Sequence, residues 1–169
     1  MKVSRWAVDR RAARGFTLLE LLVTMAVFAI LASVALPSML TSLQARQAGN
    51  MALRLTQDIS WVRAQALSGA SPATITINSD CTWLASTGST DDAQHSVSTA
   101  MLAQQDPGMT CRGIPASGIV VSFDGLGMAL VNSGTSNPAN TVLFQSGTGQ
   151  SSVEIFGSGA TVEDPQDAS

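Results

Sequence analysis

The chain has 169 residues, enough for one modest domain with an appendage and too short for two full domains. Apolar residues make up 45% and charged residues 12%, which excludes a typical disordered chain, because such a chain combines high charge with few apolar residues. The formal net charge of −3 excludes a generally basic nucleic-acid binder. Basic residues are placed unevenly, since five of the nine lie within the first 14 residues. From residue 16 onward the formal net charge is −7.

The apolar segment after this basic start runs from Phe16 to Leu36 and contains one ionisable group, Glu20. As a helix, its 21 residues would span about 31 Å, roughly the hydrocarbon thickness of a bilayer. The basic residues before it predict that its N-terminal side stays in the cytoplasm. A secretory signal peptide is disfavoured by the length of the run and by the lack of a clear small-x-small cleavage site. A plain single-pass anchor would explain the segment except for Glu20, because a carboxylate in such a segment is costly and usually has a partner.

The run Gly15-Phe16-Thr17-Leu18-Leu19-Glu20-Leu21-Leu22 resembles the prepilin cleavage motif of type IV pilins and type II secretion pseudopilins. The resemblance implies that a membrane-embedded prepilin peptidase cleaves between Gly15 and Phe16. It also implies that the peptidase methylates the new amine of Phe16 and that the hydrophobic helix is retained. Residues 1–15 are then a cleaved basic leader peptide.

Glu20 is the second residue to which this resemblance gives a role. In the family, the matching carboxylate lies against the N-terminal amine of a neighbouring subunit, so we expect Glu20 to make an assembly contact. Such pairing would neutralise two otherwise costly charges in an apolar filament core and set the axial register between helices. The alternative is a charge that is merely tolerated at the headgroup level.

Pro37 follows the apolar run directly and predicts a kink or local melting of the helix. Residues 37–68 are expected to continue as an amphipathic helix that packs on a head. Its apolar stripe comprises Leu40, Leu43, Ala48, Met51, Leu55, Ile59, Val62 and Ala66. Arg54 and Asp58 fall on other faces as an i, i+4 pair worth only a few tenths of a kcal/mol.

The end of this helix partly resembles the GspH/FimT branch of the family, over Ile59 to Ala66. Trp61 lies off the apolar stripe, so it either covers the edge of the sheet or faces a neighbouring subunit. Arg63 is either a solvated charge or an intersubunit partner. Looser resemblances to the same branch occur in the head, at Ile119 to Gly127 and at Val153 to Gly159.

The segment from 73 to 160 is predicted to be a periplasmic β-sheet head, because it is built of short alternating or apolar runs separated by glycine-rich turns. The predicted strands are 73–78, 81–85, 118–123, 128–132, 141–145 and 152–156. Residues 86–117 are expected to form a long loop with a short helix around Val97 to Gln104. An antiparallel sheet packed on the helical stripe predicts an α+β class, the pilin fold, followed by an acidic tail at 161–169.

Cys81 and Cys111 are the two cysteines, and in an exported head we expect them to form a disulfide that pins the 86–117 loop. Two buried free thiols are the alternative. A metal site is not expected, because His95 and two distant cysteines provide no ligand spacing. Glu163, Asp164 and Asp167 are interpreted as a frayed acidic tail rather than as calcium ligands.

No catalytic set is found in the sequence, and no cofactor is expected. His95 is interpreted as a solvated side chain in a polar loop, and the Gly125-Leu126-Gly127 run as a hairpin turn. A membrane-anchored enzyme is therefore disfavoured.

The sequence predicts a minor pilin or pseudopilin of the GspH/FimT type, held in the inner membrane and then assembled into a type IV pilus or a type II secretion pseudopilus. Its expected partners are prepilin peptidase and other pilin or pseudopilin subunits, the latter through the N-terminal helix. The alternative is a DNA-binding minor pilin for DNA uptake. Nucleic acid is not the expected partner, because phosphate contacts need Lys or Arg and the predicted β-sheet head contains only Arg112.

Overall fold

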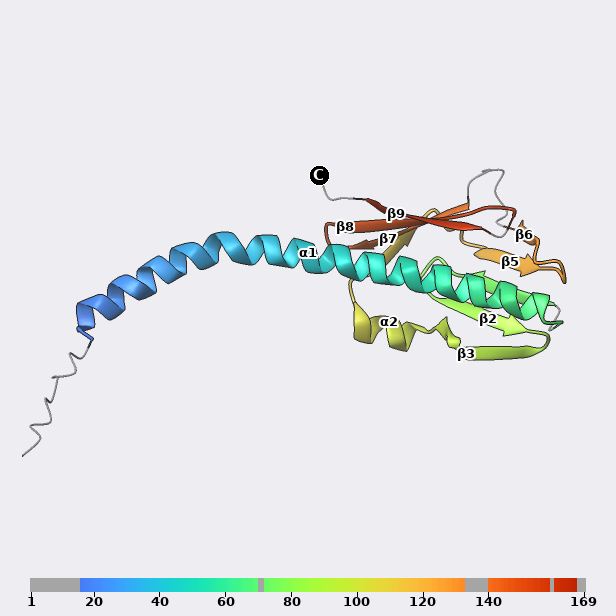
Figure 1. Ribbon diagram of the computed structural model, residues 1–169, viewed down its shortest axis with the longest axis horizontal. Coiled ribbons are helices and arrows are strands. Elements are labelled where there is room, and N and C mark those ends of the chain that lie inside the picture. The colour runs from blue at the N-terminus through green and yellow to red at the C-terminus, as the bar shows by residue number, and fades with distance from the viewer. Residues whose placement is uncertain (1–15, 70–71, 133–139, 159, 167–169) are drawn as a thin grey trace, which may run out of the picture. The chain divides into compact units, whose positions relative to one another are not determined.

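The structure is a computed structural model that describes residues 16–69, 72–132, 140–158 and 160–166 (Figure 1). The chain divides into two units, residues 1–38 and 39–169, each described here by itself, and helix α1 contributes residues to both. In chain order the elements are α1 (Leu18–Leu67), β1 (Ala73–Ile77), β2 (Trp83–Thr87), β3 (Thr90–Val97), α2 (Thr99–Gln105), β4 (Thr110–Arg112), β5 (Ile119–Phe123), β6 (Ala129–Asn132), β7 (Asn140–Ser146), β8 (Gly149–Ile155) and β9 (Thr161–Gln166).

The strands form two antiparallel sheets alongside the second half of α1 (Figure 1). The first sheet has the order β3-β2-β1-β5-β6 and the second the order β4-β7-β8-β9. Buried apolar side chains from both sheets and from α1 form one core, whose largest members are Trp83, Phe144, Leu55, Ile59, Ile75, Ile77, Ile119 and Ile155. The expected α+β arrangement, a long N-terminal helix followed by antiparallel sheet, is therefore confirmed, with two sheets where the sequence analysis anticipated one.

The buried face of α1 agrees with the predicted stripe from Ala48 onward. Ala48, Met51, Leu55, Ile59, Val62 and Ala66 are all buried, as the spacing predicted. Leu40 and Leu43 were wrongly included, since 59% and 46% of their surfaces are exposed. The β7–β8 turn lies against the helix at Gln44 and Ala45, on the C-terminal side of these two leucines.

Pro37 lies inside α1, and helical structure runs through it to Leu67. The helix is therefore not interrupted at Pro37, contrary to one of the two expectations. The other expectation, a kink at Pro37, stays a prediction. The helix ends where Gly69 adopts a φ of +94° and its N–H bonds the carbonyl of Ala66 at 3.2 Å. A left-handed glycine after the last turn is a common helix C-terminus.

The segment 86–117 is not one long loop. It contains the strands β3 and β4 as well as the predicted short helix, which is α2. Periodicity did not reveal β3 because it is an edge strand with mostly exposed polar side chains, so it has no apolar alternation to detect. Ser98 caps α2 by accepting a hydrogen bond from the N–H of Met101 at 3.3 Å.

The acidic tail is also corrected. Thr161 to Gln166 form β9, which pairs with β8 along its whole length, whereas residues 167–169 lie outside the described chain. A tail of mixed Thr, Val and acidic residues forms a strand here because β8 presents a free edge to it. The hydrogen bonds of that edge are made by backbone groups, so a mixed polar and apolar run can pair with it, with Pro165 providing no N–H of its own.

The β7–β8 turn approaches α1 so closely that only glycine fits at its end. A Cβ placed on Gly149 would lie 2.3 Å from the backbone nitrogen of Ala45. Beside it, the N–H and the hydroxyl of Thr148 each donate to Oε1 of Gln44 at 3.1 Å. This contact sets where the second sheet meets the helix.

Gly149→Ala is therefore expected to lower the free energy of unfolding by about 1–3 kcal/mol, because strand or helix must shift to admit the methyl group. Gly125→Ala is the matched control: a Cβ there meets nothing within 4 Å, and its effect should stay within about 0.5 kcal/mol. Urea denaturation of the full chain in detergent micelles measures both. Equal stability of the two variants would contradict the close approach.

The disulfide between Cys81 and Cys111 is present, as predicted. Cys81 lies in the β1–β2 connection of the first sheet and Cys111 in β4 of the second, so the bond links the two sheets. Cys81 has a φ of +67°, a conformation that a non-glycine residue adopts only when its surroundings hold it there. Asp80 contributes by accepting from the N–H and the hydroxyl of Thr82.

Replacing both cysteines with serine should lower the free energy of unfolding by about 3.5–4 kcal/mol, the chain-entropy value for a loop of 30 residues. The comparison is made by urea denaturation of the oxidised chain, the reduced chain and the double variant, each in detergent micelles. Reduced and double-variant chains should agree with one another. A double variant as stable as the oxidised chain would show that the bond does not constrain the head.

Candidate functional site

The first described residues form a capped helix start. Thr17 accepts a hydrogen bond at its side-chain oxygen from the N–H of Glu20 at 3.2 Å, and its carbonyl accepts from the N–H of Leu21 at 3.2 Å. Thr17 and Glu20 stand in the T-x-x-E spacing of a capping box. Glu20 thus lies in the first turn of α1, where a carboxylate favourably meets the positive end of the helix dipole. Phe16 is 83% exposed, and Gly15 lies outside the described residues.

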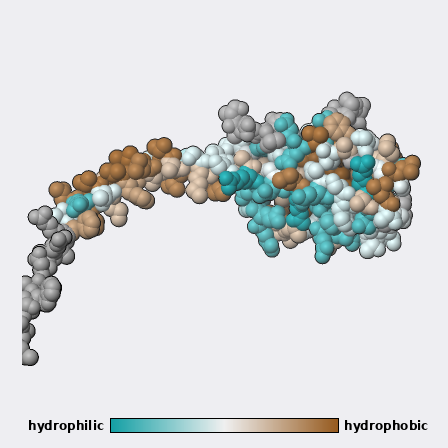
Figure 2. All heavy atoms as spheres, in the orientation of Figure 1, coloured by the Kyte–Doolittle hydropathy of each residue, from teal (hydrophilic) through white to brown (hydrophobic). Residues whose placement is uncertain are grey.

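The apolar surface of α1 before Pro37 is almost wholly exposed within its own unit (Figure 2). By length and composition, α1 is the one helix among the described residues that could cross a membrane, and none of its most apolar window is buried. The exposed large residues are Phe16, Leu18, Leu19, Leu21, Leu22, Val23, Met25, Val27, Phe28, Ile30, Leu31, Val34 and Leu36. A surface of this extent requires lipid or other protein against it.

Glu20 is the one charged side chain on this surface. Among the described residues its carboxylate makes no ion pair and has no side-chain partner, and its backbone N–H is the group that donates to Thr17. Once lipid or protein covers the helix, an unpaired carboxylate there is costly, so a cationic partner from another molecule would relieve it.

Comparison with known proteins gives one match. Residues 10–36 match the family model described as the prokaryotic N-terminal methylation motif. No curated protein and no solved structure matches the chain. The chain therefore carries the N-terminal methylation motif of type IV pilin-like proteins, joined to a long apolar helix.

This motif implies processing by prepilin peptidase and assembly with pilin-like subunits in general. The family that carries it is structural rather than enzymatic. Together with the exposed apolar helix, it fits a membrane-anchored, pilin-like protein. The resemblance drawn from Gly15 to Leu22 is thus confirmed for the motif, over residues 10–36.

A buried polar cluster in the head was missed by the sequence analysis. Asp58 is only 4% exposed, although the spacing had placed it on an outer face of the helix. Its Oδ2 accepts from Nε1 of Trp83 at 2.8 Å, and its Oδ1 lies 3.0 Å from Nδ1 of His95. The carboxylate thereby links α1 to β2 and β3.

Arg54 and His95 complete the cluster. The predicted i, i+4 pair exists, with Nε of Arg54 3.8 Å from Oδ2 of Asp58, but it belongs to a buried network rather than to a solvated face. His95 is not a solvated loop residue: it lies in β3 and stacks on Trp61 with ring centroids 3.9 Å apart. Trp61 is half-buried and packs against the core from the helix side. Covariation of Asp58 with Trp83 is the kind of signal that could have revealed the cluster.

The chemistry of this cluster is that of a structural link. An aspartate–histidine pair serves catalysis when a nucleophile adjoins the imidazole, and no hydroxyl or thiol of the described ranges donates to His95. Across the same ranges, no three His, Cys, Asp or Glu side chains gather as metal ligands. Glu163 and Asp164, the described part of the acidic tail, lie in β9.

Asp58→Ala is expected to lower the free energy of unfolding by about 2–4 kcal/mol, because it leaves the indole N–H of Trp83 buried without an acceptor. Gln57→Ala is the control on the same helix: Gln57 is exposed, and its replacement should change stability by no more than about 0.5 kcal/mol. Thermal unfolding followed by tryptophan fluorescence measures both variants. Equal stability of the two would refute the role given to Asp58.

Proposed function

We propose that the chain is a minor pilin or pseudopilin of the GspH/FimT type. Prepilin peptidase cleaves it between Gly15 and Phe16 and methylates the amine of Phe16. The product stays in the inner membrane as a single-pass protein with a cytoplasmic N-terminus and a periplasmic head. It then enters a type IV pilus or a type II secretion pseudopilus, in a tip or initiation complex.

The observation that carries this proposal is the sequence of features at the start of the chain. The methylation motif, residues 10–36, includes the start of a capped helix whose apolar surface is uncovered and whose first turn holds Glu20. A signal peptide does not need a carboxylate at that place, and a plain anchor does not need the motif. A helix that first lies in lipid and later packs against other helices needs both.

Glu20 has a defined task in this scheme. Cleavage creates a cationic amine on Phe16 that has no counter-ion in an apolar environment. The carboxylate of a neighbouring subunit neutralises it, and the short reach of both groups then fixes the axial offset between adjacent helices. The exposure of Glu20 in the isolated chain supports an intermolecular partner.

Binding of DNA, the alternative, gains no support. Residues 39–169 contain four arginines and ten acidic residues. Of the four, Arg54 is held by contacts inside the head. A phosphate-binding surface needs several free cations close together.

Glu20→Ala should reduce incorporation into filaments or tip complexes at least tenfold, because the Phe16 amine would then be buried without its counter-ion. The measurement is quantitative immunoblotting of sheared filament and membrane fractions, in the native cells. Thr24→Ala, one turn further along the same exposed surface, is the control and should assemble normally.

Mass spectrometry of the mature N-terminus accompanies this experiment. Both variants should begin at a methylated Phe16, since cleavage precedes assembly. Unchanged incorporation of the Glu20→Ala chain would disprove the pairing role. A chain that still begins at Met1 in cells with active prepilin peptidase would disprove processing.

A further inference from the structure

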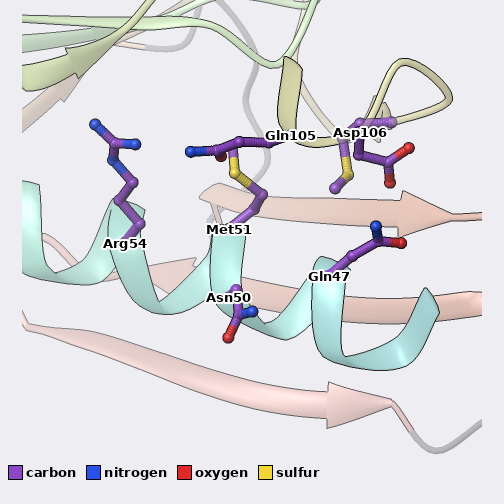
Figure 3. A pocket seen from close by; sticks show the side chains of 7 residues that line it. Gln47, Asn50, Met51, Arg54, Gln105 and Asp106 are labelled. Atoms are coloured by element: carbon purple, nitrogen blue, oxygen red, sulfur yellow. The ribbon is translucent and has the colours of Figure 1, made fainter. Parts of the chain in front are cut away.

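The β6 edge of the first sheet is the surface of the head whose chemistry selects a partner most narrowly. The pocket of about 300 Å³ between α1 and the end of α2 is less selective, because Arg54 and Asp106 both line it and bring charges of opposite sign (Figure 3). A strand edge presents a row of backbone N–H and C=O groups, which another extended chain can pair along its length. Strand β6 is such an edge, since it pairs with β5 and ends the order of the sheet.

The β5–β6 hairpin determines which backbone groups of β6 point outward. The N–H of Asp124 donates to the carbonyl of Met128 at 3.1 Å, so these two residues form a hydrogen-bonded pair. Bonded and non-bonded pairs alternate along antiparallel strands, so Leu130 bonds to β5 whereas Ala129 and Val131 do not. Ala129 and Val131 therefore direct their N–H and C=O groups away from β5, where no described strand pairs with them.

The turn of this hairpin holds the edge in strand geometry. Oδ1 of Asp124 accepts from the N–H of Leu126 at 3.0 Å and from that of Met128 at 2.8 Å. Gly127 has a φ of +73°, and a Cβ placed on it would lie 3.1 Å from Cδ2 of Leu67, so the turn lies against the end of α1. An edge held in this way loses little conformational freedom when a partner pairs with it.

Among the described strands, four form sheet edges, and β6 is the one without protection. Proteins block strand edges with charges, prolines or bulges. The residues of this kind are Asp91 and Asp92 in β3, Arg112 in β4, and Glu163, Asp164 and Pro165 in β9. Strand β3 also has a register shift against β2. Strand β6 reads Ala-Leu-Val-Asn, with neither a charge nor a proline, and Leu130 is 73% exposed.

Exposed apolar side chains adjoin this edge. Leu126, Met128 and Leu130 are all exposed on the hairpin. Figure 2 shows apolar residues gathered at the end of the head where β5 and β6 lie in Figure 1. A hollow of about 400 Å³ lies beside them, lined by the end of β5 and the start of β6. A strand that pairs here can therefore bury apolar side chains as well as backbone groups.

We propose that β6 binds an extended segment of another protein, which adds to the first sheet as a further strand. The outward backbone groups of Ala129 and Val131 supply the hydrogen bonds. Side chains on every second residue of the segment are apolar, and they pack beside Leu130 and Met128.

The charge of the head favours a basic segment. Residues 39–169 contain four arginines and ten acidic residues, a formal balance of −6. This charge attracts a basic segment and disfavours a second copy of the head as the occupant. The proposed function enters only in making the partner another subunit of the assembly; the pairing of a strand with β6 does not depend on it.

The test follows amide hydrogen exchange of Ala129 and Val131 by NMR, in the full processed chain in detergent micelles. The probe is a short peptide of alternating valine and threonine with a lysine at each end. At saturation it should slow exchange at both residues roughly tenfold, because their N–H groups become paired. The same peptide with every amide nitrogen methylated donates no backbone hydrogen bond and should have no effect. A version with glutamate in place of lysine should bind more weakly.

Val131→Pro removes an outward N–H without removing a bond to β5, and should abolish the slowing at Ala129. Thr161→Pro is the matched control on the edge strand β9. The N–H of Phe156 bonds the carbonyl of Ala160, so by the same alternation Thr161 also faces outward. This control should bind the peptide normally. Amide signals of β7 and β8 show whether each variant is folded, and the methylated peptide tests the native chain in any case.

The proposal is overturned if the lysine-ended peptide does not slow exchange, or if the methylated or glutamate-ended peptide acts equally. It is also overturned if a folded Val131→Pro chain responds like the native one. A photo-reactive residue at Leu130 then identifies the occupant in native cells. A crosslink to an extended basic segment of another protein supports the assignment, and one to a second copy of the chain overturns it. Titration in micelles needs no assembly, so its failure is distinguishable from a failure of the Glu20→Ala prediction.

Discussion

One helix has to satisfy two different environments, and the rest of the structure follows from this. Up to Leu36, α1 is apolar on every side and uncovered, a surface that water does not tolerate. From Ala48 onward the same helix is apolar on one face only, and that face is buried under two sheets. The change from all-round to one-sided apolarity marks where the head begins to cover the helix.

The head is fixed to its part of the helix by polar contacts as much as by apolar packing. Asp58 joins two strands of the first sheet to α1, and Gln44 receives the β7–β8 turn of the second. Apolar burial has no direction, so it permits a sheet to slide along a helix. The buried hydrogen bond between Asp58 and Trp83 does not permit this, because an unmade bond there leaves a desolvated group unpaired. The disulfide between Cys81 and Cys111 then joins the two sheets.

Charge is distributed along the chain in keeping with such a subunit. The basic residues gather before the apolar segment, and the head is acidic. The excess of acidic side chains in residues 39–169 disfavours association of two heads, while the exposed carboxylate of Glu20 is placed where another molecule can supply a cation. Assembly through specific pairs is compatible with a head that stays apart from its copies.

The sequence by itself determined the features that depend on local pattern. The methylation motif, the apolar helix, the buried stripe from Ala48 to Ala66, most strands of the head and the cysteine pair could be predicted, because spacing and composition act within a few residues. Only the tertiary structure decided the burial of Asp58, the place of His95 and the strands β3 and β9. Each of these depends on a residue distant in the sequence: a polar side chain is buried when a partner arrives to bond it, and a polar segment becomes a strand when a free edge adjoins it.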